Sequence, residues 1–363
     1  MVKYKKPSDK VTNIVKDLIN PIPYIQSKII KIPDSENVVL VVYIPEGNEP
    51  PYICNGSIYI RVGETSKPLA IKDRYYYEKL INKAKSFKQK RDMFVENNFT
   101  ISQEQDSSKQ PFLECYIYLD NPNNVMFEDF YSEEFFNKIH KNFNTNVNII
   151  SEEAGILLNI ELSNHYSSID SHIFRHIGTN NSLDLGLTLE LFNKGHLKFV
   201  LPFPKYSIEN INKSYENLDF YESLFSDEEK EFLTVIDCAE VIAALSVILE
   251  QYKRLLNEYD FDCKLYIKLK FKNFWRVTPY FDDINFLEHL IEYGLPINLK
   301  DELEFPPFGE YIILDLEQFD VNRIFLICLE ALGFPIHLTD SIGVGFSKFI
   351  LDIAKKQSKA ESF

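Results

Sequence analysis

Residues 50–68 read Pro-Pro-Tyr-Ile-Cys-Asn-Gly-Ser-Ile-Tyr-Ile-Arg-Val-Gly-Glu-Thr-Ser-Lys-Pro, and this stretch decides the fold of the amino-terminal part of the chain. Ile58–Val62 predicts a short strand, and Gly63 permits a sharp turn after it. The apolar run Val38–Ile44 lies just before the stretch. Its lack of polar residues predicts a strand that is buried on both faces, at the centre of a sheet. A helix from about residue 71 to residue 91 is expected to follow.

The charges of the chain are unevenly distributed. The 363 residues carry a formal net charge of −15. Residues 1–91 contain 17 Lys and Arg against 9 Asp and Glu, a net of +8, whereas the remainder contains 22 against 45, a net of −23. Phosphates respond to the local field rather than to the total charge. A basic amino-terminal part therefore leaves nucleic-acid binding open in an acidic protein.

The quoted stretch and its surroundings resemble the Schlafen AlbA-type (AlbA_2-like) domain. In that family a strand ends in an aliphatic-Val-Pro-like tripeptide, here Tyr43-Ile44-Pro45, and a Pro-rich approach follows. A Tyr-x-Arg-x-Gly-(Ser/Glu)-x-(Thr/Ser) motif comes next, here residues 59–66, and then a helix. The resemblance covers about residues 11–85 and corresponds to the back half of the domain. It implies a small mixed α/β module that binds nucleic acid.

The residues of this motif suggest how such a module could hold a phosphate backbone. Arg61 at a strand end, the turn at Gly63 and the hydroxyls of Thr65 and Ser66 could form an anion-holding corner. Basic side chains would extend the corner into a track, and Tyr59 or Tyr52 could stack on a base. The predicted nucleic-acid-binding residues are Tyr59, Arg61, Thr65, Lys67, Lys72, Arg74, Lys83 and Lys88.

A purely structural role for these residues is the alternative. Arg61 could bridge to an acidic neighbour such as Glu64 or Asp73. The Lys-rich stretch could then be the solvated face of an ordinary helix.

The catalytic part of the family pattern is missing. In Schlafen-type nucleases the metal-binding carboxylates lie in the front half of the domain, with a Glu-x-Lys-like start and an Asn-Thr-x-Gly-Gly turn. No Asn-Thr-Gly-Gly segment occurs in the sequence, and the carboxylates before Val38 lack the spacing of the family. We therefore expect a truncated module with no catalytic residue, no metal ligand and no cofactor, and we lean against an enzyme. Either the module is a binding platform, or a separate chain supplies the other half and this chain is the half-site component of a split nuclease.

The resemblance also implies a setting and partners. Bacterial relatives of such modules occur in transcriptional regulators and anti-phage systems, which implies a role in regulation or antiviral defence. A third alternative is an assembly scaffold, in which the basic part docks on the acidic part of a second copy in a head-to-tail homo-oligomer. No segment resembles a signal peptide or spans a bilayer, so we expect a cytoplasmic protein that does not bind membranes.

The predicted domains are residues 1–96, a linker at 97–111 and an acidic domain at 112–363 that could divide near 205–235. Asp237–Tyr259 is the strongest helix of the chain. Cys263–Leu269 alternates apolar and Lys residues, which predicts a half-exposed strand. A last helix is expected at about 344–356. Helices and strands do not alternate regularly, so the fold class is α+β.

Other chemical groupings are weaker. His165, His172 and His176 lie in one stretch with Asp170, and His172 and His176 have the spacing of a helical metal-binding pair. No Glu accompanies them as in a His-Glu-x-x-His motif, so we interpret them as surface or core histidines. Five dispersed cysteines argue against both a disulfide framework and a cysteine-based zinc site.

Overall fold

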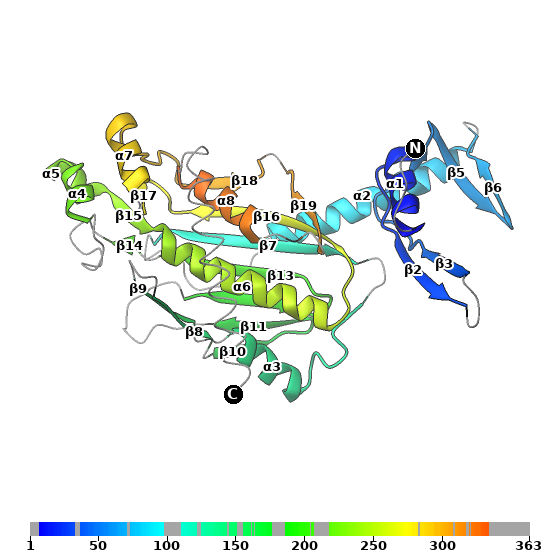
Figure 1. The fold of residues 1–363 in the computed structure, drawn as a ribbon, viewed down its shortest axis with the longest axis horizontal. Coiled ribbons are helices and arrows are strands. Elements are labelled where there is room, and N and C mark those ends of the chain that lie inside the picture. The colour runs from blue at the N-terminus through cyan, green and yellow to red at the C-terminus, as the bar shows by residue number, and fades with distance from the viewer. Residues whose placement is uncertain are drawn as a thin grey trace. The chain divides into compact units, whose positions relative to one another are not determined.

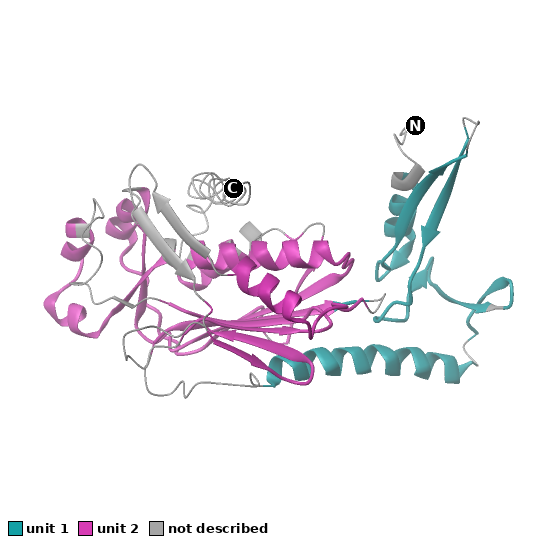
Figure 2. Ribbon diagram, turned by 90° about the horizontal axis from the view of Figure 1, so that it is seen from below, with its two compact units in different colours: residues 1–97, 120–124 teal, residues 98–119, 125–363 magenta. Residues whose placement is uncertain are grey.

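The structure is a computed structural model, and the chain divides into two compact units (Figure 2). Unit 1 consists of residues 1–97 with 120–124, and unit 2 of residues 98–119 with 125–363. Both contain helices and strands, which confirms the α+β class. The residues described are 7–32, 37–70, 73–97, 110–121, 125–143, 145–150, 155–160, 162, 164–175, 186–203, 205–206, 218–281, 284–307, 309–316, 319 and 321–333.

Unit 1 combines two short sheets with two helices (Figure 1). A four-stranded sheet has the order β1-β4-β5-β6, and β2 pairs with β3 in a separate antiparallel hairpin. The strands at 58–62 and 38–44 are confirmed as β5 and β3, whereas β1, β4 and β6 were not predicted. The bounds are α1 Pro7–Leu18, β1 Ile19–Asn20, β2 Gln26–Lys31, β3 Val38–Tyr43, β4 Ile53–Cys54, β5 Ser57–Val62, β6 Thr65–Pro68 and α2 Arg74–Glu96.

Two tight turns order the four-stranded sheet. Asn55 and Gly56 join β4 to β5, and both have positive φ, at 48° and 76°. That is the pattern of a type I′ turn, for which Asn-Gly is the preferred sequence. Gly63 and Glu64 join β5 to β6, and only Gly63 has positive φ, at 62°, as in a type II′ turn. The short-range sequence therefore fixes the register of β5 against both neighbours.

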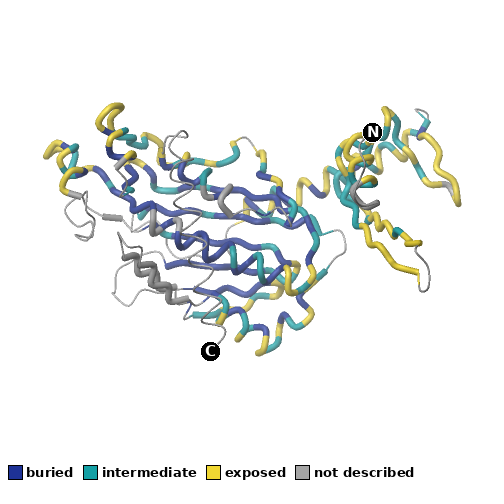
Figure 3. The backbone as a smooth tube through the Cα atoms, in the orientation of Figure 1, coloured by how far each residue is buried: buried dark blue, intermediate teal, exposed yellow. Residues whose placement is uncertain are grey.

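The expectation that Val38–Ile44 is buried on both faces is wrong. Val39 is 47% exposed and Val41 43%, and they lie on one face of β3; Val42 on the other face is 36% exposed. Figure 3 shows this exposure along the β2–β3 hairpin. Among the described residues β3 pairs only with β2, so it is an edge strand rather than a central one. An unbroken apolar run fits a strand that is covered on both faces, and within the described chain the side chains of β3 are only partly covered.

Unit 2 is built on an eight-stranded sheet. Seven strands follow the order β10-β11-β12-β13-β7-β16-β18, and β19 also pairs with β16. The strands β12 and β13 form a hairpin around Asn193–His196, with Leu191 opposite Leu197. The bounds are β7 Phe112–Asp120, β10 Asn164–Ser167, β11 Ser171–Arg175, β12 Thr188–Phe192, β13 Leu197–Pro202, β16 Lys264–Lys272, β18 Leu303–Phe305 and β19 Ile312–Asp315.

Smaller elements complete unit 2. A three-stranded sheet has the order β14-β15-β17, and β8 pairs with β9. Ser226 and Glu229 form a capping box at the start of α5, as the acidic run there suggests. The bounds are α3 Glu133–Phe143, β8 Thr145–Ile150, β9 Gly155–Ile160, β14 Lys205–Tyr206, α4 Leu218–Ser223, α5 Asp227–Phe232, β15 Thr234–Asp237, α6 Cys238–Glu258, β17 Val277–Tyr280, α7 Ile284–Tyr293 and α8 Val321–Ala331.

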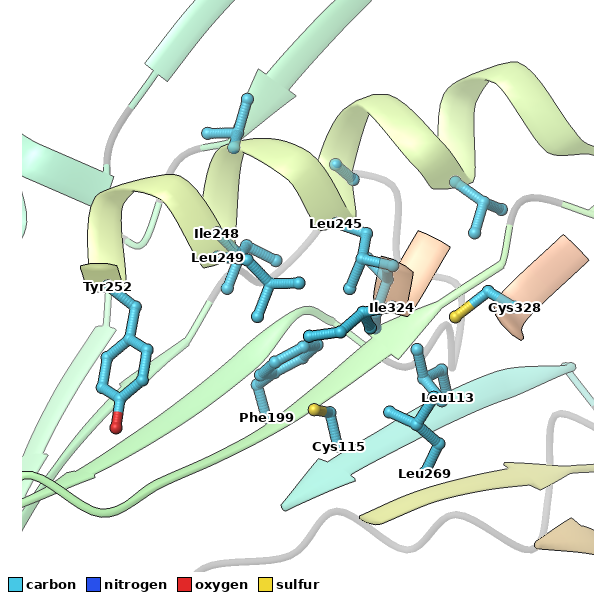
Figure 4. Packing of buried hydrophobic residues seen from close by; sticks show 14 of the residues in the cluster. Leu113, Cys115, Phe199, Leu245, Ile248, Leu249, Tyr252, Leu269, Ile324 and Cys328 are labelled. Carbon is cyan, nitrogen blue, oxygen red and sulfur yellow. The ribbon is translucent and has the colours of Figure 1, made fainter. Parts of the chain in front are cut away.

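The helix α6 packs its apolar stripe on the eight-stranded sheet of unit 2 (Figure 4). Leu245 and Leu249 point toward Phe199 of β13 and Cys115 of β7, and one turn further along the helix the Tyr252 hydroxyl donates to the carbonyl of Gly195. The side chains of all five of these residues other than Gly195 are fully buried. Their spacing of three and four residues places them on one face of the helix. The helix was the strongest sequence prediction because this stripe is long and unbroken. Its contact with the sheet forms the core of unit 2.

The prediction that β16 is half exposed is wrong. Its polar positions include Lys268, whose side chain is 1% exposed. The Lys268 Nζ lies 2.8 Å from the carboxylate of Glu304 and also donates to the carbonyls of Pro306 and Glu310. These partners compensate for the loss of water around the ammonium group. Alternating sequence shows which face is polar, but it does not show whether that face is exposed.

Candidate nucleic-acid interface

The β5–β6 hairpin carries four of the predicted residues and divides them between two faces. Arg61 pairs with Ser66, and Tyr59 with Pro68, so these side chains share one face. Thr65 pairs with Val62, and Lys67 with Ile60, on the opposite face. Side chains alternate along a strand, so adjacent positions cannot meet. The hairpin therefore brings Tyr59, Arg61 and Ser66 together and separates them from Thr65 and Lys67.

Arg61 is exposed to solvent on its face of this hairpin. Its Nε donates to the carbonyl of Gly63 at 3.2 Å, which holds the side chain along the turn. Among the described residues no carboxylate forms an ion pair with Arg61, and Asp73 accepts instead from the amide of Ala70. The bridge from Arg61 to Glu64 or Asp73, which the sequence left open, is not formed. The guanidinium is therefore available to an anion.

The two candidate stacking residues differ in access. Tyr59 is 48% exposed on the same face as Arg61. Tyr52 is half-buried, and its ring lies so close to Gly47 that a Cβ there would collide with it. Burial raises the pKa of the Tyr52 hydroxyl above its ordinary value. Tyr59 is thus the better placed of the two rings for stacking on a base.

Two of the predicted cations on α2 already have acidic partners. Lys83 Nζ lies 2.6 Å from Glu46 Oε1, and Arg74 Nε lies 2.5 Å from Glu78 Oε1. Lys83 lowers the pKa of the Glu46 carboxyl, and Lys79 adds a weaker effect in the same direction. Such exposed pairs contribute little to stability, but each one reduces the positive potential offered to a phosphate.

The other lysines of α2 keep their charge exposed. Among the described residues no carboxylate pairs with Lys85 or Lys88, and both side chains are exposed. They are three residues apart and so lie on one flank of the helix. Lys83 and Lys88 are five residues apart, hence about 140° apart around the helix axis. The helix therefore offers Lys85 and Lys88 together, and Lys83 on another flank. Lys72 lies outside the described residues.

Comparison with known proteins adds one finding. Residues 2–70 match the family model described as Schlafen, AlbA_2. The chain carries a Schlafen AlbA_2 domain. The match begins and ends earlier than the expected 11–85, and it gives no support to restricting the resemblance to the back half of the domain. No curated protein and no solved structure matches the chain. The AlbA_2 domain supports nucleic-acid binding as the function of this part of the chain.

Sequence reasoning missed Glu46, which the structure places against Lys83. The two residues are 37 positions apart, so no local pattern connects them. By contrast the Asn55-Gly56 dipeptide is a strong local hairpin signal, and it could have identified β4 and its pairing with β5.

Two further findings concern the described residues only. They contain no group of three or more His, Cys, Asp or Glu side chains that could hold a metal ion. None of their helices is long and apolar enough to cross a membrane.

Proposed function

We propose that unit 1 binds the phosphate backbone of DNA or RNA through two exposed basic surfaces. The first is the hairpin face of Tyr59, Arg61 and Ser66, inside the matched residues 2–70, and the second is the α2 flank of Lys85 and Lys88, on the helix that follows the match. The observation that carries the proposal is that the Arg61, Lys85 and Lys88 charges have no acidic partner among the described residues, in a unit whose first part matches a nucleic-acid-associated family. The role that follows is a regulatory or antiviral-defence protein that recognises nucleic acid.

The two surfaces supply different parts of recognition. Lysines on a helix flank attract any phosphate backbone, which gives affinity without sequence preference. An exposed tyrosine beside an arginine can stack on a base that is not paired, which favours single strands. We therefore expect the chain to bind single-stranded nucleic acid at least as tightly as a duplex of the same length.

The experiment is a comparison of charge-reversed variants at one low salt concentration. The double variant Lys85→Glu/Lys88→Glu should bind single-stranded RNA or DNA more weakly by on the order of tenfold, because two phosphate contacts become repulsive. The matched control Lys141→Glu/Lys300→Glu makes the same charge change at exposed lysines of unit 2 and should keep wild-type affinity. Equal losses in both double variants would mean that only the total charge matters, and the proposed surface would be wrong.

Removing the acidic partner of Lys83 should have the opposite effect. Glu46→Gln releases the Lys83 ammonium from its ion pair and adds a free cation to α2. Lys83 lies on another flank than Lys85 and Lys88, so the change acts through the positive potential of the helix and not through the proposed surface itself. We expect affinity for nucleic acid to rise by roughly two- to fivefold. Fluorescence anisotropy with a labelled oligonucleotide measures the change, and a loss of affinity or no change would mean that the potential around α2 does not attract the nucleic acid.

A second function, assembly, is favoured by the exposed edge of β3. From Val38 to Ile44 this strand carries no charged side chain, and most of its apolar side chains are more than a third exposed. Among the described residues of unit 1 the buried hydrophobic side chains are Leu69, Phe87 and Val95, a small core for a unit of this length. An exposed apolar edge strand with free backbone groups is a template for another strand.

The occupant we propose for this edge is β3 of a second copy. Because β3 is uncharged, two copies can lie antiparallel about a two-fold axis without opposing like charges. The other strand of the hairpin, β2, carries Lys28 and Lys31. These charged side chains protect the edge of β2 from such pairing. In this contact the same surface of each copy meets its equivalent, so it would be isologous. The charge distribution alone suggests a different, head-to-tail contact, in which the basic part of one copy docks on the acidic part of another.

A further inference from the structure

We propose that His165 and His172, together with the Ser167 hydroxyl, form a binding site for a divalent transition-metal ion of the zinc type at the edge of the unit 2 sheet. The site is separate from the proposed nucleic-acid surfaces. It also differs from the helical pair of His172 and His176 that the sequence suggested. Residue 172 lies on a strand, and His176 lies outside the described residues.

Strand pairing brings the three side chains together. Ser167 on β10 lies opposite His172 on β11, and such partners point to the same face of the sheet. His165 lies two residues before Ser167 on β10, so it shares that face. Phe174, two residues after His172 on β11, lies on the same face and is buried. A hairpin of ordinary geometry is thus enough to bring two imidazoles and a hydroxyl to one point.

The donor atoms form a compact triangle. His165 Nε2 lies 3.0 Å from His172 Nδ1, and Ser167 Oγ lies 3.4 Å and 3.1 Å from these two atoms. Two imidazole nitrogens that bind one zinc ion at about 2.0–2.1 Å are roughly 2.9–3.4 Å apart at the usual bond angles. The observed spacing fits an ion placed just above the triangle. The remaining coordination positions would be taken by water, because Ser167 is exposed and His165 is only half-buried.

The protonation of His172 is set by its second nitrogen. His172 Nε2 lies 2.7 Å from the carbonyl oxygen of Phe130, which can only accept, so Nε2 carries the proton and donates. The neutral ring then directs the Nδ1 lone pair toward His165 and Ser167. A backbone carbonyl on the outer nitrogen is a common partner of metal-binding histidines, since it fixes both the tautomer and the ring orientation.

Aromatic rings hold both imidazoles in place. Phe136 of α3 packs on His165 with ring centroids 4.2 Å apart, and Phe130 packs on His172 at 4.3 Å. These ring contacts restrict the rotation of both imidazoles, so the two nitrogens of the triangle keep their positions.

The test is a calorimetric titration of the full chain with zinc ions. The wild type should bind one zinc ion per chain at this site. His165→Ala should weaken binding by at least tenfold, and Ser167→Ala by a smaller factor. His165 and Ser167 are not core residues, so both variants should fold. The controls His289→Ala and Cys54→Ser remove another histidine and the most accessible cysteine, and they should leave binding unchanged.

A second readout separates a metal site from a hydrogen-bonded pair of histidines. Zinc should raise the melting temperature of the wild type, because an ion that binds only the folded state stabilises it, and it should not raise that of His165→Ala. Cobalt(II) should give visible absorption bands in the wild type that zinc removes. If no zinc binds, or if His165→Ala binds it as tightly as the wild type, the histidines are only a hydrogen-bonded part of the hairpin.

Discussion

Phe199→Ala should lower the free energy of unfolding of unit 2 by about 3–5 kcal/mol, the range for removing a fully buried phenylalanine. Phe199 belongs to β13 and is 0% exposed, and its ring lies between the sheet and the helix α6. The core around it is made by elements distant in sequence, so the cavity left by the ring cannot close without moving α6. A loss of this size is comparable with the total stability of many domains.

Chemical denaturation measures this loss conveniently. The chain has one tryptophan, Trp275, and it lies in unit 2, so its fluorescence reports the unfolding of that unit. Phe232→Ala is the control, because Phe232 is 59% exposed and its ring forms a cation–π pair with Arg276. That variant should lose less than about 1 kcal/mol. If the two variants lose equal stability, the packing of α6 on the sheet does not hold unit 2 together.

The second large effect concerns assembly through β3. Val39→Lys/Val41→Lys should convert a self-associating protein into a monomer, with the dissociation constant raised at least tenfold. Positions 39 and 41 lie on one face of β3. In a two-fold antiparallel pair centred on Leu40, position 39 of one copy meets position 41 of the other, so the new ammonium groups repel. Sedimentation equilibrium over a range of protein concentrations gives the constant.

The matched control replaces apolar residues that are equally exposed elsewhere. Ile291 is 60% exposed and Ile313 is 52% exposed, both in unit 2, and Ile291→Lys/Ile313→Lys should leave association unchanged. A wild type that is monomeric at every concentration would end the proposal that β3 pairs with itself. Association that survives in the Val39→Lys/Val41→Lys variant would place the contact on another surface.

Local sequence patterns predicted the elements whose signals are complete within a few residues. The stripe of α6 requires only that residues three and four apart be apolar, and the strand Ile58–Val62 is followed by its own turn glycine. The burial of β3 could not be predicted in this way. An apolar run shows that a strand can be covered on both faces, but whether a neighbour covers it depends on the rest of the chain or on another chain.

In the candidate interface, too, local sequence predicted some features and could not predict others. Arg61 was identified from its motif, and the structure places it on an exposed face without an acidic partner among the described residues. Its separation from Thr65 and Lys67 depends on the register of a two-residue turn, where a shift of one residue reverses every side chain. The pairing of Lys83 with Glu46 joins residues far apart in sequence, which no periodicity reveals.

The salt dependence of nucleic-acid binding by the full chain tests the central claim most directly. If Arg61, Lys85 and Lys88 neutralise phosphates, the logarithm of the affinity for a DNA duplex should fall linearly with the logarithm of salt concentration. The slope should be about −2.7, or −0.9 for each of the three phosphates, and Lys85→Glu/Lys88→Glu should make it shallower by roughly 1.8. A chain that binds no duplex or single strand at low salt, or whose affinity does not change with salt, would contradict the account.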